Sequence, residues 1–90
     1  MVHEIVTVLD GEEVLRRATE FFAERVPMQA AFPEKRGPTF LLLRGQGGEE
    51  IAMAVTAAAA GTHVRASTLL FDQAVDRFFS TLPPALEASA

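Results

Sequence analysis

The chain of 90 residues contains no cysteine, no tryptophan and no tyrosine, and none of its apolar runs approaches the roughly 20 residues of a membrane helix. Without cysteine there is no disulfide bond, no thiol nucleophile, no thiolate zinc site and no iron–sulfur cluster. Histidines and carboxylates are then the only candidate metal ligands, and we expect neither a metal nor a cofactor. Because a positively charged start followed by an apolar run is also missing, we expect a soluble, cytoplasmic protein.

Positive charge is scarce as well. Eight basic residues, of which only Lys35 is a lysine, stand against twelve acidic ones and give a net charge of −4. This charge repels phosphate backbones and anionic lipids at long range, so we expect no binding to nucleic acid or to a membrane. The preference for arginine over lysine, together with fifteen alanines, is typical of a GC-rich bacterial genome.

The residues that are present suffice for one folded domain. Hydrophobic residues make up 49% of the chain and charged residues 22%, which is a globular composition. We expect a single α+β domain over residues 1–83, followed by a frayed tail at 84–90. A domain this small leaves about a third of its unfolded surface exposed, so self-association is a natural way to bury more apolar area.

The first half of the chain predicts a strand, a helix and a long loop. The segment Val2–Leu9 is rich in β-branched residues, and Asp10 with Glu13 forms a capping-box pattern that begins a helix. The apolar stripe of this helix continues to Val26, and Pro27 ends it. Three prolines and no regular period predict a loop over Pro27–Pro38, with one helical turn around Met28–Phe32 whose two end residues seal the core.

The second half predicts a three-stranded meander and a second helix. The strands are expected at Thr39–Arg44, Glu49–Ala58 and Thr62–Leu69, joined by turns at Gly45–Gly48 and Ala60–Gly61. An apolar stripe then predicts a helix from Phe71 to Leu82, stopped by Pro83 and Pro84. The order is β-α-β-β-β-α, which predicts a four-stranded antiparallel sheet with two helices packed on one face and Thr39–Arg44 at an edge.

Alternation along the strands predicts which side chains lie on the other, open face of the sheet. The larger apolar residues, such as Ile51 and Met53, should meet the helices. Small and polar residues then cover the open face, joined by His3 and Thr7 or their neighbours in the first strand: Ala52, Ala54, Thr56, His63, Arg65 and Ser67. Such a surface permits close approach, so we interpret it as a ligand or partner surface.

Candidate chemistry is limited. His3 and His63 lie on one face if the first and last strands pair, where they could bind a metal or shuttle a proton, although we expect plain surface histidines. Arg44 and Arg65 could hold an anion on the open face. Gly45–Gly48 lacks the lysine and the strand-to-helix context of a phosphate loop, so we interpret it as a hairpin turn.

Two parts of the chain, His3 to Val26 and Gly61 to Pro83, resemble the two ends of helix-grip proteins, the START and polyketide-cyclase-like superfamily. The resemblance implies a first strand leading into a capped helix, a meander, and a C-terminal helix that closes over a curved sheet around a small apolar ligand. This chain is shorter than those proteins and has fewer strands. The order of elements is equally similar to a TATA-binding-protein-like half-domain, but no residues match those that intercalate DNA.

Three functional hypotheses follow. The leading one is a non-enzymatic module that forms a homodimer or another homo-oligomer, or binds a small ligand, through the open face. The first alternative is helix-grip-type binding of a small apolar ligand. The second is a small enzyme that uses His3, His63 or Arg65; the sequence names no catalytic residue beyond these three candidates.

Overall fold

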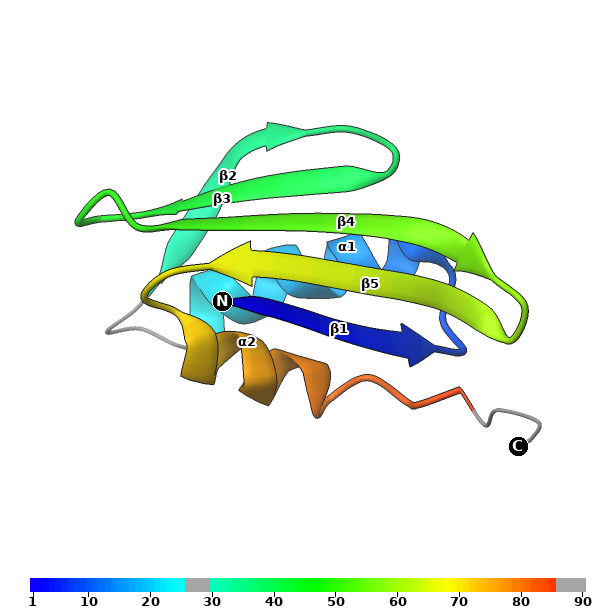
Figure 1. Cartoon of the computed structure of the whole chain (residues 1–90). Coiled ribbons are helices and arrows are strands. Elements are labelled where there is room, and N and C mark those ends of the chain that lie inside the picture. The colour runs from blue at the N-terminus through cyan, green and yellow to red at the C-terminus, as the bar shows by residue number, and fades with distance from the viewer. Residues whose placement is uncertain (26–29, 86–90) are drawn as a thin grey trace.

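The computed structural model describes residues 1–25 and 30–85 and shows a curved antiparallel sheet with two helices on one side (Figure 1). The sheet has five strands in the order β1-β5-β4-β3-β2. They are β1 (Val2–Thr7), β2 (Ala31–Arg36), β3 (Phe40–Gly45), β4 (Glu50–Ala58) and β5 (Gly61–Thr68). The helices are α1 (Gly11–Glu20), continued by a wider turn η1 (Phe21–Arg25), and α2 (Asp72–Phe79). The expected α+β class is confirmed.

The number of strands differs from the expected four, because β2 occupies part of the segment predicted as a loop. It pairs with β3 from Ala31 opposite Gly45 to Arg36 opposite Leu41, with a bulge between Pro33 and Lys35. An edge strand forms backbone hydrogen bonds on one side only, so β2 tolerates Pro33. Three consecutive charged residues also interrupt the alternation of apolar and polar residues by which a strand is predicted. The predicted helical turn is therefore wrong at residues 31 and 32, while Met28 lies outside the described residues.

Two further expectations change with β2. Phe32 does not seal the core: 48% of its surface is exposed, and the neighbouring Ala31 is buried instead. The strand predicted at the edge, now β3, pairs with β2 on one side and with β4 on the other. Its backbone is therefore not available for pairing with another chain.

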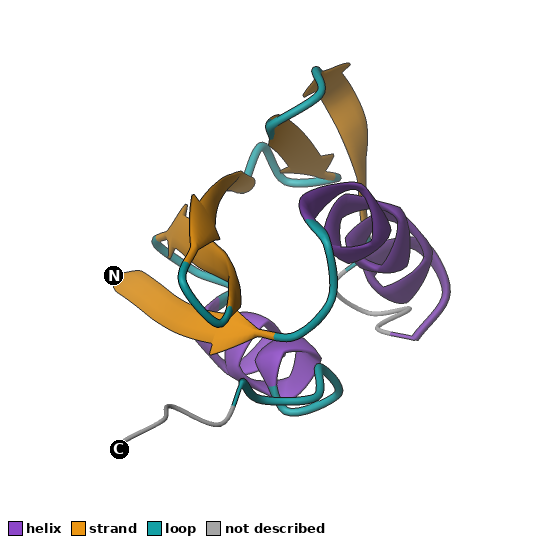
Figure 2. Ribbon diagram, turned by 90° about the vertical axis from the view of Figure 1, so that its right-hand side faces the viewer, coloured by secondary structure: helices purple, strands orange, loops and turns teal. Residues whose placement is uncertain are grey.

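The core lies between the sheet and the two helices. Figure 2 shows the strands along an arc, with both helices on its concave side. The predicted helix stripes do face this core: Val14 and Ala18 of α1 and Val75 of α2 are buried. The rings of Phe22 and Phe78 are both fully buried and lie 5.6 Å apart at their centroids.

The start of α1 has half of a capping box. The Asp10 carboxylate accepts a hydrogen bond of 2.8 Å from the Glu13 backbone N–H, as the sequence predicts. The Glu13 carboxylate turns instead to Arg16 and Arg17, with contacts of 2.6 and 2.8 Å. Hydrogen bonds from Arg16, then Arg17, lower the pKa of Glu13 to about 2.

The chain after α2 runs back along the outer edge of β1. Pro83 accepts hydrogen bonds from the Val8 backbone N–H and the Thr7 hydroxyl, at 3.2 and 2.6 Å. Ala85 donates its backbone N–H to Val6 at 3.0 Å, and Thr7 bridges to Pro84. The first two residues of the segment expected as a tail thus cover a free strand edge; residues 86–90 lie outside the described part of the chain.

Candidate functional site

The six residues predicted for the open face do lie together on the side of the sheet away from the helices. Cross-strand pairing places Ala52 opposite Ser67, Ala54 opposite Arg65, and Thr56 opposite His63. Directly paired residues in antiparallel strands share a face, and all six side chains are exposed or half-buried. Their inward neighbours Ile51, Met53 and Val64 are buried.

In β1, the residues on the open face are the sequence neighbours of His3 and Thr7, not His3 and Thr7 themselves. His3 pairs with Ala66 and Thr7 with Thr62, which places both on the helix side of the sheet. Val2, Glu4 and Val6 share the open face instead; they pair with Ser67, Arg65 and His63 respectively. Apolar residues occupy both faces of β1, so alternation alone left its orientation open.

His3 is largely buried between β1 and α2. Its Nε2 lies 2.8 Å from Asp72 Oδ1 and its Nδ1 lies 3.2 Å from Asp76 Oδ1, while the ring packs edge-on against Phe79. The His3 hydrogen bond lowers the pKa of Asp72. These contacts join a strand to a helix, which is a structural role.

His3 and His63 therefore cannot share a ligand, because they lie on opposite faces of the sheet. His63 Nε2 lies 2.7 Å from Glu4 Oε1. Within residues 1–25 and 30–85, no group of three histidines and carboxylates is arranged to hold a metal ion.

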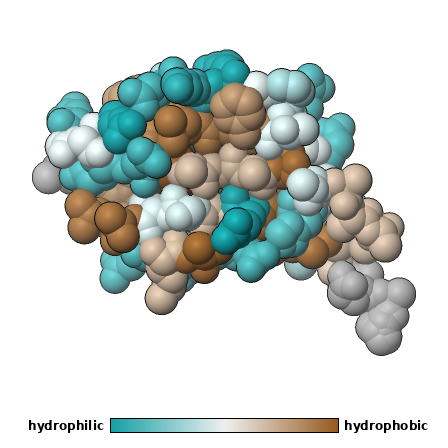
Figure 3. Space-filling model, turned by 45° about the horizontal axis from the view of Figure 1, so that its top comes forward, coloured by the Kyte–Doolittle hydropathy of each residue, from teal (hydrophilic) through white to brown (hydrophobic). Residues whose placement is uncertain are grey.

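A shallow depression of about 410 Å³ lies in the open face. Ala52, Ala54 and Ser67 belong to the predicted set, whereas Phe40 and Leu42 were not predicted for this surface. These two residues belong to the open face because Phe40 pairs with Ala54 and Leu42 with Ala52. In Figure 3, apolar side chains form a band across this side of the molecule, with hydrophilic side chains around it. Because β3 is apolar without interruption, its sequence shows no alternation that would predict which of its side chains are exposed.

Ion pairs neutralise most of the charge on this face. Arg44 lies 2.7 Å from Glu34 and 3.2 Å from Glu50, and the hydrogen bond with Glu34 raises the pKa of Arg44. Arg44 does lie on the open face, but its guanidinium is already paired with carboxylates, so it is not free to hold an anion together with Arg65. Lys35 and Arg65 both line the depression, and neither forms an ion pair with another described residue.

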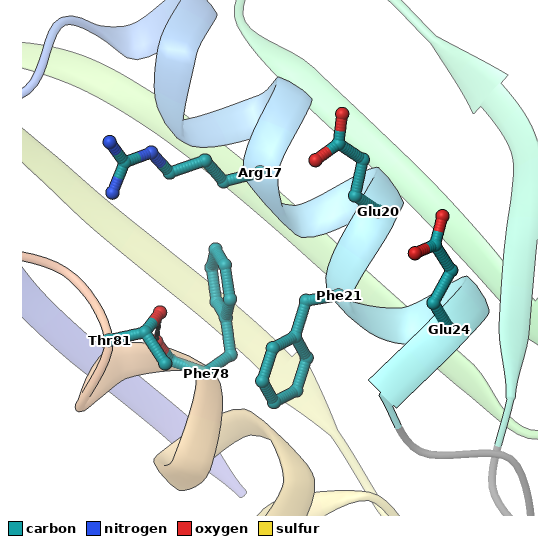
Figure 4. A pocket seen from close by; sticks show the side chains of 6 residues that line it. All are labelled: Arg17, Glu20, Phe21, Glu24, Phe78 and Thr81. Carbon is teal, nitrogen blue, oxygen red and sulfur yellow. Dashed lines mark hydrogen bonds between the residues drawn. The ribbon is translucent and has the colours of Figure 1, made fainter.

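A second hollow, of about 230 Å³, lies between the two helices. Figure 4 shows Phe21 and Phe78 between α1 and α2, with Arg17, Glu20 and Glu24 on the α1 side and Thr81 on the other. The space between α2 and the sheet, where the helix-grip resemblance places an apolar ligand, is filled by buried side chains that include Phe22 and Phe78.

Comparison with known proteins gives no match: no family model, no curated protein and no solved structure is similar to this chain. None of the helices in the described part of the chain is long and apolar enough to cross a membrane. The function must therefore be argued from the open face itself.

Proposed function

We propose that this protein is a small interaction module that associates with a second copy of itself through the open face of its sheet. The observation that carries the proposal is the apolar surface around the depression. Phe40 is 44% exposed, Phe32 48% and Val2 42%, and they lie on the same face as the small residues Ala52 and Ala54. Burying exposed apolar surface is the main favourable term in association.

The edges of the sheet are poor sites for association. Residues 83–85 cover the C-terminal part of the edge of β1, where Val6 and Val8 form backbone hydrogen bonds with them. The edge of β2 carries Pro33, a bulge, and the charged residues Glu34, Lys35 and Arg36. Prolines, bulges and charges are the features that keep edge strands from pairing with other chains. These features favour contact through the face of the sheet over contact through its edges.

The size of the face sets the strength of the expected contact. Five strands spaced about 4.8 Å apart and about six residues long give a face of roughly 24 × 20 Å. Two copies would then bury about 1,000 Å², which is near the lower limit for a specific interface. We therefore expect a reversible dimer with a dissociation constant in the micromolar range or weaker.

Substitution of Ala54 by arginine tests the proposal. Ala54 is exposed at the centre of the face, so the fold tolerates the change, whereas the long arginine side chain would keep a second copy from closely approaching the small residues around it and would place another cation beside Arg65. Sedimentation velocity over a range of concentrations should show a wild-type dimer and a folded Ala54→Arg monomer.

The matched control is Ala59→Arg, which introduces the same side chain in the exposed turn between β4 and β5 and should leave the dimer intact. A wild-type protein that stays monomeric at concentrations on the order of 1 mM overturns the proposal, since that limit corresponds to about 4 kcal/mol of binding. A dimer of unchanged affinity in Ala54→Arg also overturns it, because the contact would then lie on another surface.

The second candidate function, helix-grip-type binding of a small apolar ligand, stays a prediction, because the hollow between α1 and α2 has four polar residues beside Phe21 and Phe78 in its lining. Native mass spectrometry of the freshly purified protein separates the two candidates. A carried ligand adds its own mass to that of the chain, whereas self-association doubles the mass of the chain.

A further inference from the structure

We propose that the depression in the open face also binds an elongated apolar molecule that carries an anionic group at each end, as an α,ω-dicarboxylate does. This inference goes beyond self-association, because it assigns a small-molecule site to Lys35, Arg65 and the apolar floor between them. The site lies on the side of the sheet away from both helices.

The charge of the site is the first argument. Among the described residues of the open face, Arg44 and His63 lie against carboxylates, at 2.7 Å in each case. Lys35 and Arg65 have no such partner in this part of the chain, and both line the depression. Glu4, the cross-strand neighbour of Arg65, lies against His63, so the hollow itself is lined by two cations and by no carboxylate. Anions are the ligands that such a hollow attracts.

The floor of the depression is the second argument. Between the two cations lie the side chains of Leu42, Ala52 and Ala54, with Phe40 beside them. Small side chains let a ligand approach the sheet closely, and the phenylalanine and leucine offer apolar contact. The volume of about 410 Å³ lies within the range of small-molecule sites. The middle of the ligand is therefore apolar.

The spacing of the two cations is the third argument. Lys35 is on β2 and Arg65 on β5, with β3 and β4 between them. Three strand spacings amount to about 14 Å between the two backbones, so an extended ligand that lies across β3 and β4 can span from one cation to the other. Two anionic groups joined by an apolar chain can each meet one cation. Decanedioate, with a carboxylate at each end of an extended ten-carbon chain, is a suitable probe.

The second copy and the ligand would occupy the same surface. Decanedioate should therefore shift the protein from dimer to monomer, because a ligand that binds only the monomer stabilises it by mass action. The ligand site does not depend on the dimer, however, and can be tested at protein concentrations at which sedimentation shows monomers alone.

The test is a titration followed by the amide signals of the ¹⁵N-labelled protein. Decanedioate should cause saturable shifts at Leu42, Ala52 and Ala54. Decanoate, which has one charge, should bind on the order of fivefold more weakly, the factor that one exposed ion pair of about 1 kcal/mol provides. Butanedioate, whose two carboxylates are joined by only two methylene groups, should also bind more weakly, because it loses most of the apolar contact. Decanoate binding as tightly as decanedioate would overturn the two-ended ligand.

Charge-reversal variants complete the test. Lys35→Glu and Arg65→Glu should each weaken decanedioate binding on the order of fivefold, whereas the control Arg77→Glu, on the exposed side of α2, should bind as the wild type does. All three positions are exposed, so circular dichroism should show the same fold. Unchanged binding in both open-face variants, or no shifts at the depression, refutes the ligand site, even if the dimer is confirmed.

Discussion

At the scale of single residues, two phenylalanines from different helical segments pack against each other at the centre of the core. Phe22 and Phe78 are both fully buried and in ring contact. Replacing either with alanine should lower the free energy of unfolding by about 3–5 kcal/mol through lost burial and the cavity left behind. Urea denaturation measures the loss, with Phe40→Ala, a half-exposed ring, as the control that should lose much less.

A loss below about 1 kcal/mol at both core positions would contradict the packing described here. The double variant should lose less than the sum of the two single variants, because each ring forms part of the wall around the other.

The contact of His3 with Asp72 predicts a dependence of stability on pH. The pKa of Asp72 lies below its ordinary value of 3.8 in the folded protein, because its carboxylate is hydrogen-bonded to His3. The contribution of Asp72 is then present in full above pH 3.8 and is lost as the pH falls through the lowered pKa. Asp72→Asn should be less stable than the wild type at pH 7.

The same two proteins should differ less in stability as the pH falls through the lowered pKa of Asp72, because the wild-type carboxylate then loses its charge as well. Urea denaturation over this pH range checks this. A difference that stays the same from pH 7 down to the lowest pH at which both proteins fold would mean that the charge of Asp72 contributes nothing.

At the scale of elements, the sequence predicted those whose side chains repeat with a clear period. Both helices, β4 and β5 have buried and exposed residues in regular alternation, and their core faces are as predicted. β2 was missed because an edge strand with a bulge needs no period, and its charged residues are typical of a loop. The open-face position of Phe40 and Leu42 was missed because Phe40–Leu43 is apolar without interruption.

The segment at residues 83–85 gives a prediction about β1. Removing residues 83–90 eliminates three hydrogen bonds, those of Thr7 and Val8 to Pro83 and that of Ala85 to Val6. At about 1 kcal/mol each, their loss should destabilise the protein by roughly 3 kcal/mol and expose an edge that promotes aggregation.

The control for this truncation removes residues 86–90 only, which keeps all three hydrogen bonds. Thermal unfolding of both shortened chains decides the matter. Equal stability of the two would show that the segment at residues 83–85 adds nothing to the edge of β1.

At the scale of the whole molecule, net charge separates the two proposed binding events. Two copies with a net charge of −4 repel each other, and salt screens that repulsion. Raising the salt concentration from about 0.05 to 0.5 M should therefore strengthen the dimer, as measured by sedimentation. Over the same range it should weaken decanedioate binding, which depends on opposite charges. A dimer that weakens with salt would point to a contact dominated by ion pairs.

The position of β1 in the sheet has a consequence for how the protein is made. β1 precedes the other strands of the sheet in the chain, yet within the described residues its strand neighbour is β5, the last of them, and Val2 pairs with Ser67. A ribosome adds about 5–20 residues per second, so β1 waits roughly 3–13 seconds for its partner. During that time its backbone groups are open to any other strand nearby. Among the five strands, β1 is thus the one that waits longest for its partner and is most exposed to wrong pairing.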